Sequence, residues 1–258
     1  GYHLVGMPDR AVRESQYRIA AALKSCGLKM MVKRMTINLT PADIRKQGTG
    51  FDLPIALGIL QSSGQLITDQ LARLMIVGAL SLDGSILPVP GTLSMAKCAM
   101  RHGLKGIIVP WENIQEASLV DGIEVYGAKH LSQITSFLMG GTWLKPEKPN
   151  KIRQSDQRIT EVDLSQIRGQ MVAKRVLEIS CLGNHHLLMM GPPGVGKTLL
   201  AKSVTGILPK MSDQEIQEVT QVYSSRLNQV FGILNHQRPF RQPHHHCTNA
   251  GMLGGATP

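Results

Sequence analysis

The stretch GPPGVGKTLLAKS, residues Gly191 to Ser203, decides how the second half of the chain is interpreted. It contains the pattern G-x-x-x-x-G-K-[ST] in full, ending in Lys197 and Thr198. Glycines let such a loop curl so that several N–H groups point at phosphate oxygens, and the following helix adds the positive end of its dipole. The pattern therefore predicts an ATP-binding loop made of Gly191, Pro192, Pro193, Gly194, Val195, Gly196, Lys197, Thr198 and Leu199.

Two residues of this loop are predicted to be catalytic. Lys197 would supply positive charge to the β and γ phosphates, and the Thr198 hydroxyl is placed to ligate Mg²⁺. The flanking sequence agrees with this role, because it predicts a helix at 170–182, a short apolar strand at 186–190 and a helix from residue 198. ATP and Mg²⁺ are therefore the expected cofactors.

Hydrolysis of ATP needs carboxylates at the end of a second strand, and the acids after Thr198 do not fit that position. These acids are Asp213, Glu215 and Glu218, in the stretch MSDQEIQEV. Here Ser212 is the expected helix N-cap and Glu215 its capping-box partner. We therefore expect a chain that binds ATP without hydrolysing it, as a piece of a longer protein.

The chain divides into two halves of different character. The polar stretch 141–160 carries two prolines and is typical of a linker between domains at 1–140 and 161–258. In the first half, helices are expected at 10–27, 51–64 and 94–103, with Gly27 as a C-cap. Strands are expected at 33–39, 75–80, 86–89, 107–110 and 122–128, with a hairpin turn at Asp83-Gly84. The pattern predicts an α/β fold.

Composition narrows the class of protein. The 258 residues carry a formal charge of +10, which favours polyanion partners and fits a basic solvated surface equally well. No apolar run reaches the about 20 residues that a membrane helix needs. The four cysteines form no C-x-x-C pair, so a reduced cytoplasmic protein is expected rather than a disulfide or zinc scaffold.

Around the loop, the sequence resembles the AAA+ ATPase family. The resemblance lies in Pro192-Pro193 and in the upstream stretch DLSQIRGQ. In that family a Gly-Gln step lies near the adenine, which would be Gly169 and Gln170 here, with Ile167 as an apolar wall. The same residues equally fit the N-terminus of a helix.

Four longer blocks carry a more specific resemblance. They are VGMPDRAVRES (5–15), INLTPADIRKQGTGFDLPIALGIL (37–60), GSILPVPGTL (84–93) and RPFRQPHHHCTNAGMLGG (238–255). In this order they are similar to the YifB/ComM family of magnesium chelatase-like AAA+ ATPases. The resemblance implies that both ends of the chain are truncated. It also implies a ribosomal-S5-domain-2-like, Lon-like fold for residues 1–140, and the front of a chelatase-type ATPase domain for residues 161–258.

The resemblance also implies an activity. A member of this family would act as a homo-oligomeric ring, a hexamer, that drives branch migration of DNA in recombination or natural transformation. Its DNA partner would be branched or single-stranded, and no membrane would be involved. Two alternatives stay open, namely the ATPase subunit of a magnesium chelatase and a non-enzymatic module in which residues 1–140 organise assembly.

Peptide cleavage of the Lon type is not expected. That chemistry needs a serine nucleophile and a lysine. The segment from Gly48 to Gly58 holds no serine, and Lys97 lies about one helical turn beyond the position that a Lon lysine would take. The stretch FDLPIALGIL is instead predicted to be a packed helix with Asp52 as its cap.

Two groups of residues are candidates for nucleic-acid contact. Arg238 and Arg241 belong to a stretch that faces either DNA or, as a loop held by Phe240 and Pro243, the protein itself. A second set is either a phosphate-contacting patch or a solvated face, and consists of Lys29, Lys33, Arg34, Arg45 and Lys46. The cluster His244–His246 with Cys247 lacks a second ligand pair at a finger-like spacing, so zinc binding is not favoured.

Overall fold

The computed structural model of the chain describes residues 2–30, 34–141, 144–147, 162–225 and 238–254. The chain forms two units, of which the first comprises Gly1–Ile152 and Gln217–Leu234 and the second comprises Arg153–Ile216 and Asn235–Pro258. Most of the predicted linker, 141–160, lies outside the described residues. Within those ranges, no helix has the length and apolar character needed to cross a membrane.

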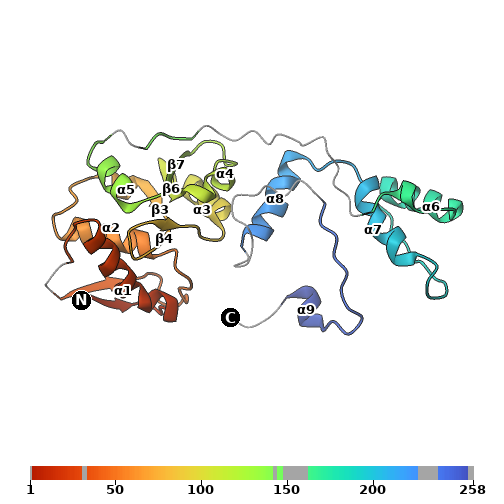
Figure 1. The fold of residues 1–258 in the computed structure, drawn as a ribbon, viewed down its shortest axis with the longest axis horizontal. Helices are drawn as coiled ribbons and strands as arrows, with labels where there is room; N and C mark the ends of the chain where they lie inside the picture. The colour runs from red at the N-terminus through yellow and green to blue at the C-terminus, as the bar shows by residue number, and fades with distance from the viewer. Residues whose placement is uncertain (1, 31–33, 142–143, 148–161, 226–237, 255–258) are drawn as a thin grey trace. The chain divides into compact units, whose positions relative to one another are not determined.

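Helices and strands alternate along the first unit (Figure 1). Its helices are α1 (Arg10–Ser25), α2 (Asp52–Ser62), α3 (Thr92–Arg101), α4 (Ile114–Ala117) and α5 (Leu131–Leu138), with the short 3-10 helices η1 (Gln70–Arg73) and η2 (Trp111–Asn113). Its strands are β1 (Tyr2–Val5), β2 (Met35–Asn38), β3 (Leu74–Ile76), β4 (Ala79–Leu80), β5 (Ile86–Leu87), β6 (Gly106–Pro110) and β7 (Glu124–Ala128). The predicted α/β class is confirmed for this unit.

A parallel sheet in the order β3-β6-β7 lies at the centre of the first unit. Successive residues of β6 point to opposite faces of the sheet. Ile108 belongs to an apolar cluster shared with α1, α2 and α5, whereas Ile107 and Val109 belong to a cluster shared with α3 and α4. Burial on both faces explains why β6 is a continuous apolar run in the sequence.

Two smaller strand pairs accompany this sheet. Strands β1 and β2 pair in parallel, and β4 and β5 form an antiparallel hairpin. The hairpin turn falls at Asp83-Gly84, as predicted. Gly84 has φ 93°, and a Cβ atom there would lie 2.6 Å from the Cys26 sulfur, so both the backbone and the packing require glycine.

The prediction of one continuous strand over residues 75–80 was wrong. The segment forms β3 and β4, which belong to different sheets. Between them the Gly78 N–H donates to the Gly50 carbonyl, and the Gly78 carbonyl accepts from the Leu53 N–H, both at 3.1 Å. These bonds divert the chain to the start of α2, and the absence of a Cβ atom at Gly78 allows the close approach to Leu53.

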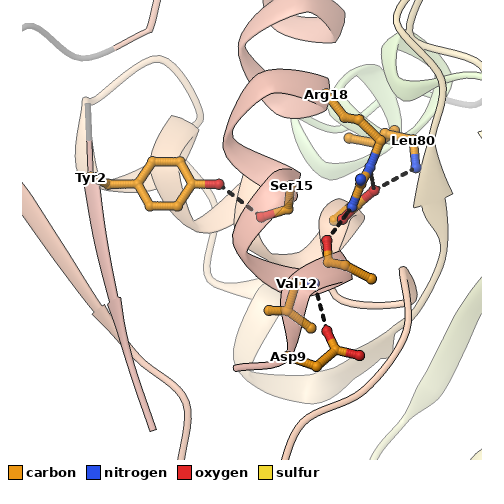
Figure 2. A network of polar contacts seen from close by, with 8 residues as sticks. Tyr2, Asp9, Val12, Ser15, Arg18 and Leu80 are labelled. Carbon is orange, nitrogen blue, oxygen red and sulfur yellow. Dashed lines mark hydrogen bonds and ion pairs between the residues drawn. The ribbon is translucent and has the colours of Figure 1, made fainter. Parts of the chain in front are cut away.

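Asp52 was predicted to cap α2, and the structure gives its side chain a different role. Phe51 occupies the N-cap without a side-chain hydrogen bond. The Asp52 carboxylate is fully buried and accepts from Arg18 Nε at 2.7 Å and from Arg18 Nη2 at 2.9 Å. It also accepts from the Leu80 N–H at 3.3 Å, so one carboxylate joins α1, α2 and β4 (Figure 2).

Helix α1 has well-defined ends. The Asp9 carboxylate caps its start by accepting from the Val12 N–H at 2.8 Å (Figure 2). The other oxygen of Asp9 accepts from the Gly48 N–H at 3.1 Å. The helix ends at Ser25, and Gly27 follows at φ 72°. Cys26 is the C-cap, so Gly27 stands one residue beyond its predicted place, and its left-handed conformation closes the helix there.

The second unit is helical in the residues that the structure describes. It contains η3 (Leu164–Gln166), α6 (Met171–Gly183), α7 (Lys197–Ile207), α9 (Asn249–Leu253) and the first turn of α8 (Asp213–Ser224), which continues into the first unit. The strand predicted at 186–190 is not formed. No described segment of this unit pairs with it, and Leu188 and Met190 are 81% and 86% exposed.

Candidate nucleotide-binding site

The glycine-rich loop leads directly into helix α7. Gly194 and Gly196 have φ 84° and 87°, a conformation that other residues adopt at a cost. Gly196 is the N-cap of α7, and no side chain caps the helix there. The first N–H groups of α7 have no partners within the helix, so this end offers donors and a positive dipole to an anion.

Lys197 is the first residue of α7, and its ammonium folds back over the loop. It donates to the carbonyl oxygens of Gly191 at 2.8 Å and Pro192 at 2.7 Å. Charge-assisted hydrogen bonds to an anionic oxygen are stronger than bonds to a neutral carbonyl, so a phosphate can compete for this ammonium. Thr198 is the next residue of the helix and is exposed. Loop, cation and hydroxyl thus fit a magnesium nucleotide.

Residues on the inner side of α7 hold it in place. Leu200 is 4% exposed, and its N–H donates to the Gly196 carbonyl at 3.0 Å. Ser203 is fully buried, and its hydroxyl donates to the Leu200 carbonyl at 2.8 Å. Leu200 and Ser203 lie on the buried face of α7, whereas Thr198 and Leu199 are exposed. The helix is therefore held by packing on one face, and its N-terminal end remains accessible to a ligand.

The candidate adenine residues lie between η3 and α6. Ile167 is 7% exposed, and its carbonyl accepts from the Lys174 ammonium. Gly169 and Gln170 have φ 66° and 54°, and Gln170 is the N-cap of α6. Helix α7 packs against both α6 and η3, so the structure brings this segment to the helix that begins at Lys197.

The acids that follow the loop lie on α8. Ser212 and Glu215 form the predicted capping box, in which the Ser212 N–H donates to Glu215 Oε2 at 2.7 Å and the Glu215 N–H donates to Ser212 Oγ at 3.2 Å. The bond from the Ser212 N–H, together with the neighbouring Arg238 guanidinium, lowers the pKa of Glu215. This carboxylate is therefore engaged in holding a helix end.

Arg238, a candidate for nucleic-acid contact, has partners inside the second unit. Its Nη1 donates to Glu215 Oε1 at 2.9 Å, and its Nε donates to the Pro209 carbonyl at 2.8 Å. From the sequence, Glu215 and Arg238 have separate predicted roles. They are 23 residues apart in the chain, and their opposite charges are the only feature of the sequence that indicates a pair. Arg241, the other candidate, is exposed.

The histidine cluster is exposed, and its rings lie close together at tilted angles. The rings of His244, His245 and His246 have centroids 4.1 to 5.4 Å apart. In the part of the chain that the structure describes, no group of three or more His, Cys, Asp or Glu side chains is arranged to hold a metal ion.

One member of the basic set proposed on the first half is buried rather than exposed. Lys46 is 6% exposed, and its ammonium donates to the Pro41 carbonyl. Arg45 instead lines a pocket of about 530 Å³ with Arg10 and Arg13. Lys33 lies outside the described residues.

Comparisons with known proteins cover both units. A family model described as subunit ChlI of Mg-chelatase matches residues 1–113, and a model described as magnesium chelatase, subunit ChlI, matches residues 163–258. The chain is 39% identical over 255 residues to the uncharacterized protein YifB of Escherichia coli, covering 99% of the chain and 50% of YifB. It is 40% identical over 260 residues to competence protein ComM of Haemophilus influenzae, covering 100% of the chain and 51% of ComM.

A more distant match is confined to half of the chain. Lon protease 2 of Bacillus subtilis is 27% identical over 138 residues, which is 50% of the chain and 24% of that protein. The chain spans about half the length of YifB and ComM.

Proposed function

This chain belongs to the YifB/ComM family of magnesium chelatase-like proteins, and on that premise we propose that residues 191–199 bind ATP with Mg²⁺. The observation that carries the proposal is the loop itself, with two left-handed glycines, an uncapped helix start and the Lys197 ammonium folded over it. Membership of a family with AAA+ character supports an ATPase as the class of enzyme.

The residues divide the work of holding the nucleotide. Lys197 neutralises the β and γ phosphates, and the Thr198 hydroxyl ligates Mg²⁺, which offsets phosphate charge when bound. The N–H groups from Gly194 onward hold phosphate oxygens. The adenine contacts Ile167, Gly169 and Gln170. This assignment is supported by the packing of η3 against α7, the helix that begins at Lys197.

For the whole protein we propose a cytoplasmic, ring-shaped hexamer that couples ATP hydrolysis to branch migration of DNA. The support for this role is the 40% identity to competence protein ComM and the formal charge of +10. The pocket lined by Arg10, Arg13 and Arg45 is a place where phosphate groups can be held, and exposed Arg241 is a second one.

A second candidate function is the ATPase subunit of a magnesium chelatase. The descriptions of both matching family models favour it. The two candidates share the ATP site and differ in the macromolecule that ATP drives. With the full-length protein, ATP-dependent movement of a four-way DNA junction supports the first, and inertness on junctions contradicts it.

The ATP site is tested with this chain by titrating fluorescent ATP in the presence of Mg²⁺. Lys197→Ala is expected to weaken binding about 10- to 100-fold, because a charge-assisted contact worth about 1.5–3 kcal/mol is lost. Lys210→Ala removes the same charge outside the loop and is expected to bind as the wild type does. Equal affinities in all three proteins contradict the proposal.

A further inference from the structure

One cavity of the first unit, the arginine cavity, carries several positive charges. Its volume is about 530 Å³, and its lining consists of Met7, Pro8, Asp9, Arg10, Arg13 and Arg45. All three arginines are exposed, so their guanidinium groups are accessible to a ligand in solution. Three cations stand against one carboxylate in this lining, and a hollow lined mainly by one sign of charge attracts ligands of the opposite sign.

Two segments that are distant in the sequence form the walls of the arginine cavity. The Asp9 N–H donates to the Lys46 carbonyl at 2.9 Å, and the Lys46 N–H donates to the Met7 carbonyl at 3.1 Å. These bonds hold the backbone beside Arg45 against the turn that precedes α1. The cavity is thus a product of tertiary structure within the first unit, and not of one run of basic residues.

The carboxylate in the lining is engaged by the backbone. Asp9 Oδ1 accepts from the Val12 N–H at 2.8 Å (Figure 2), and Asp9 Oδ2 accepts from the Gly48 N–H at 3.1 Å. Asp9 therefore caps α1 and joins the two walls. The guanidinium groups are the charged groups of the lining that remain for a ligand.

Two of the arginines are oriented by a single bond each. Arg10 Nε donates to Glu14 Oε1 at 2.8 Å, and Arg13 Nε donates to the Pro8 carbonyl at 3.2 Å. A guanidinium carries five N–H donors, and the terminal Nη groups take no part in these two bonds. The planar fork of donors matches the oxygens of a phosphate, so phosphate is the anion that this lining suits best.

The backbone of the lining supplies an observation that is independent of charge. Met7 has φ 56°, in the left-handed region that residues other than glycine seldom occupy, and it is 55% exposed. Such a conformation costs energy and persists only where the surrounding structure holds it, and it occurs most often at binding and catalytic sites. The strained turn at Met7 therefore also points to a binding site.

The lining has little means to read a base. Bases stack on aromatic rings, and side-chain amides read their edges, but the described residues of the lining include neither an aromatic ring nor an amide. Arginine reads guanine where a protruding helix or strand carries it into the major groove, and these arginines line a hollow instead. Contacts to phosphate alone bind all sequences alike.

We propose that the arginine cavity binds phosphate groups of a nucleic-acid backbone, independently of the base sequence and of ATP. Arg10, Arg13 and Arg45 supply the charge, and the first unit holds nucleic acid without help from the loop at 191–199. The choice of nucleic acid as the source of phosphate rests on the proposed function and on the formal charge of +10. The anion site itself rests on the lining of the cavity.

The site is tested by fluorescence anisotropy of this chain with two short labelled DNA duplexes of unrelated sequence, at several salt concentrations. The two duplexes are expected to bind alike. Arg13→Gln and Arg45→Gln each remove one phosphate contact, so each is expected to make the slope of log affinity against log salt concentration shallower by about 1. Both side chains are exposed, so neither substitution is expected to disturb the fold.

The matched control is Arg101→Gln, which removes the same charge from the exposed end of α3, outside the cavity. It is expected to keep the slope of the wild type. A wild type that binds no DNA, slopes unchanged in both cavity variants, or an equal change in the control would each overturn the proposal. Binding to phosphatidylserine vesicles but not to DNA would assign the cavity to a membrane surface and overturn it as well.

Further measurements separate this proposal from the proposed function. Lys197→Ala is expected to bind both duplexes as the wild type does, and weaker binding in that variant contradicts independence from ATP. If the full-length protein moves no DNA junction while the cavity variants of this chain show shallower slopes, the proposed function fails and the arginine cavity stands. If junctions move but the slopes do not change, the cavity proposal alone fails.

Discussion

The two units differ in how much of their apolar surface they bury. In the first unit, residues such as Leu57, Leu131 and Ile107 are fully buried in clusters that cover both faces of a sheet. In the described part of the second unit, Met171, Leu182 and Met190 are 74%, 80% and 86% exposed. The first unit therefore has the packed core expected of a domain, and the second has a small one.

This difference separates two kinds of inference. The fold of the first unit depends on many long-range contacts, each of which contributes to one core. The candidate site of the second unit depends on a short run of backbone and on one lysine, so its chemistry is readable even where little is buried. Substitutions in each unit test this difference. Those at buried positions of the first unit are expected to lower the free energy of unfolding more than those in the second.

The largest effect is expected from Asp52→Ala in the first unit. It leaves Arg18, whose side chain is 22% exposed, without the carboxylate that binds its guanidinium at 2.7 Å. Breaking a buried pair in this way is expected to lower the free energy of unfolding by about 4 kcal/mol. Urea denaturation followed by circular dichroism measures it.

A matched control is Asp69→Ala, which breaks the exposed pair between Asp69 and Arg73, whose atoms are 3.8 Å apart. Exposed pairs contribute about 0 to 1 kcal/mol, so this variant is expected to unfold nearly as the wild type does. Similar losses in the two variants contradict the role given to Asp52.

A smaller effect is expected from removing one leucine of each core. Leu57→Ala, in the first unit, is expected to cost about 3 kcal/mol, because the residue is fully buried among other core side chains. Leu177→Ala, at 2% exposure in the second unit, is expected to cost about 2 kcal/mol, the low end for such a change, since few apolar side chains of that unit's described residues are buried. Hydrogen exchange of the amides in each unit measures the loss of stability in each variant. Equal losses would contradict the difference in packing between the two units.

The sequence predicted local features better than distant ones. The hairpin turn at Asp83-Gly84 and the capping box of Ser212 and Glu215 follow from residues a few positions apart, and the structure confirms both. The pairing of Asp52 with Arg18 spans 34 residues, and no local pattern announces it. Asp52 looked like a cap because it begins a helix, and burial decided otherwise.

At the candidate site, too, local features follow from the sequence and pairing between distant segments does not. The loop and the start of α7 follow from a motif of consecutive residues, and the structure forms the helix one residue before the predicted position. The strand expected at 186–190 depends on a neighbouring strand, and the described residues of the second unit supply none. An apolar run alone cannot specify its partner.

The smallest expected effect is a pH dependence at the start of α8. The pKa of Glu215 is lowered by the Ser212 N–H and by Arg238, so its contribution to stability is complete above about pH 4.3, the ordinary value, and is lost as pH falls through the lower folded value. An NMR titration of the amides from Asp213 to Ile216 follows this loosening. Glu215→Gln is expected to remove the dependence, and an unchanged titration in that variant contradicts the assignment.

The most direct test of the ATP site is hydrogen exchange of the whole chain with and without ATP and Mg²⁺. At an ATP concentration just sufficient to saturate the wild type, we expect slower exchange of the amides from Gly194 to Leu200, no change in β6 and β7, and little effect in Lys197→Ala, because that variant binds ATP about 10- to 100-fold more weakly. Exchange of the loop that ATP does not change in the wild type, or that ATP slows equally in Lys197→Ala, would contradict the proposed ATP site.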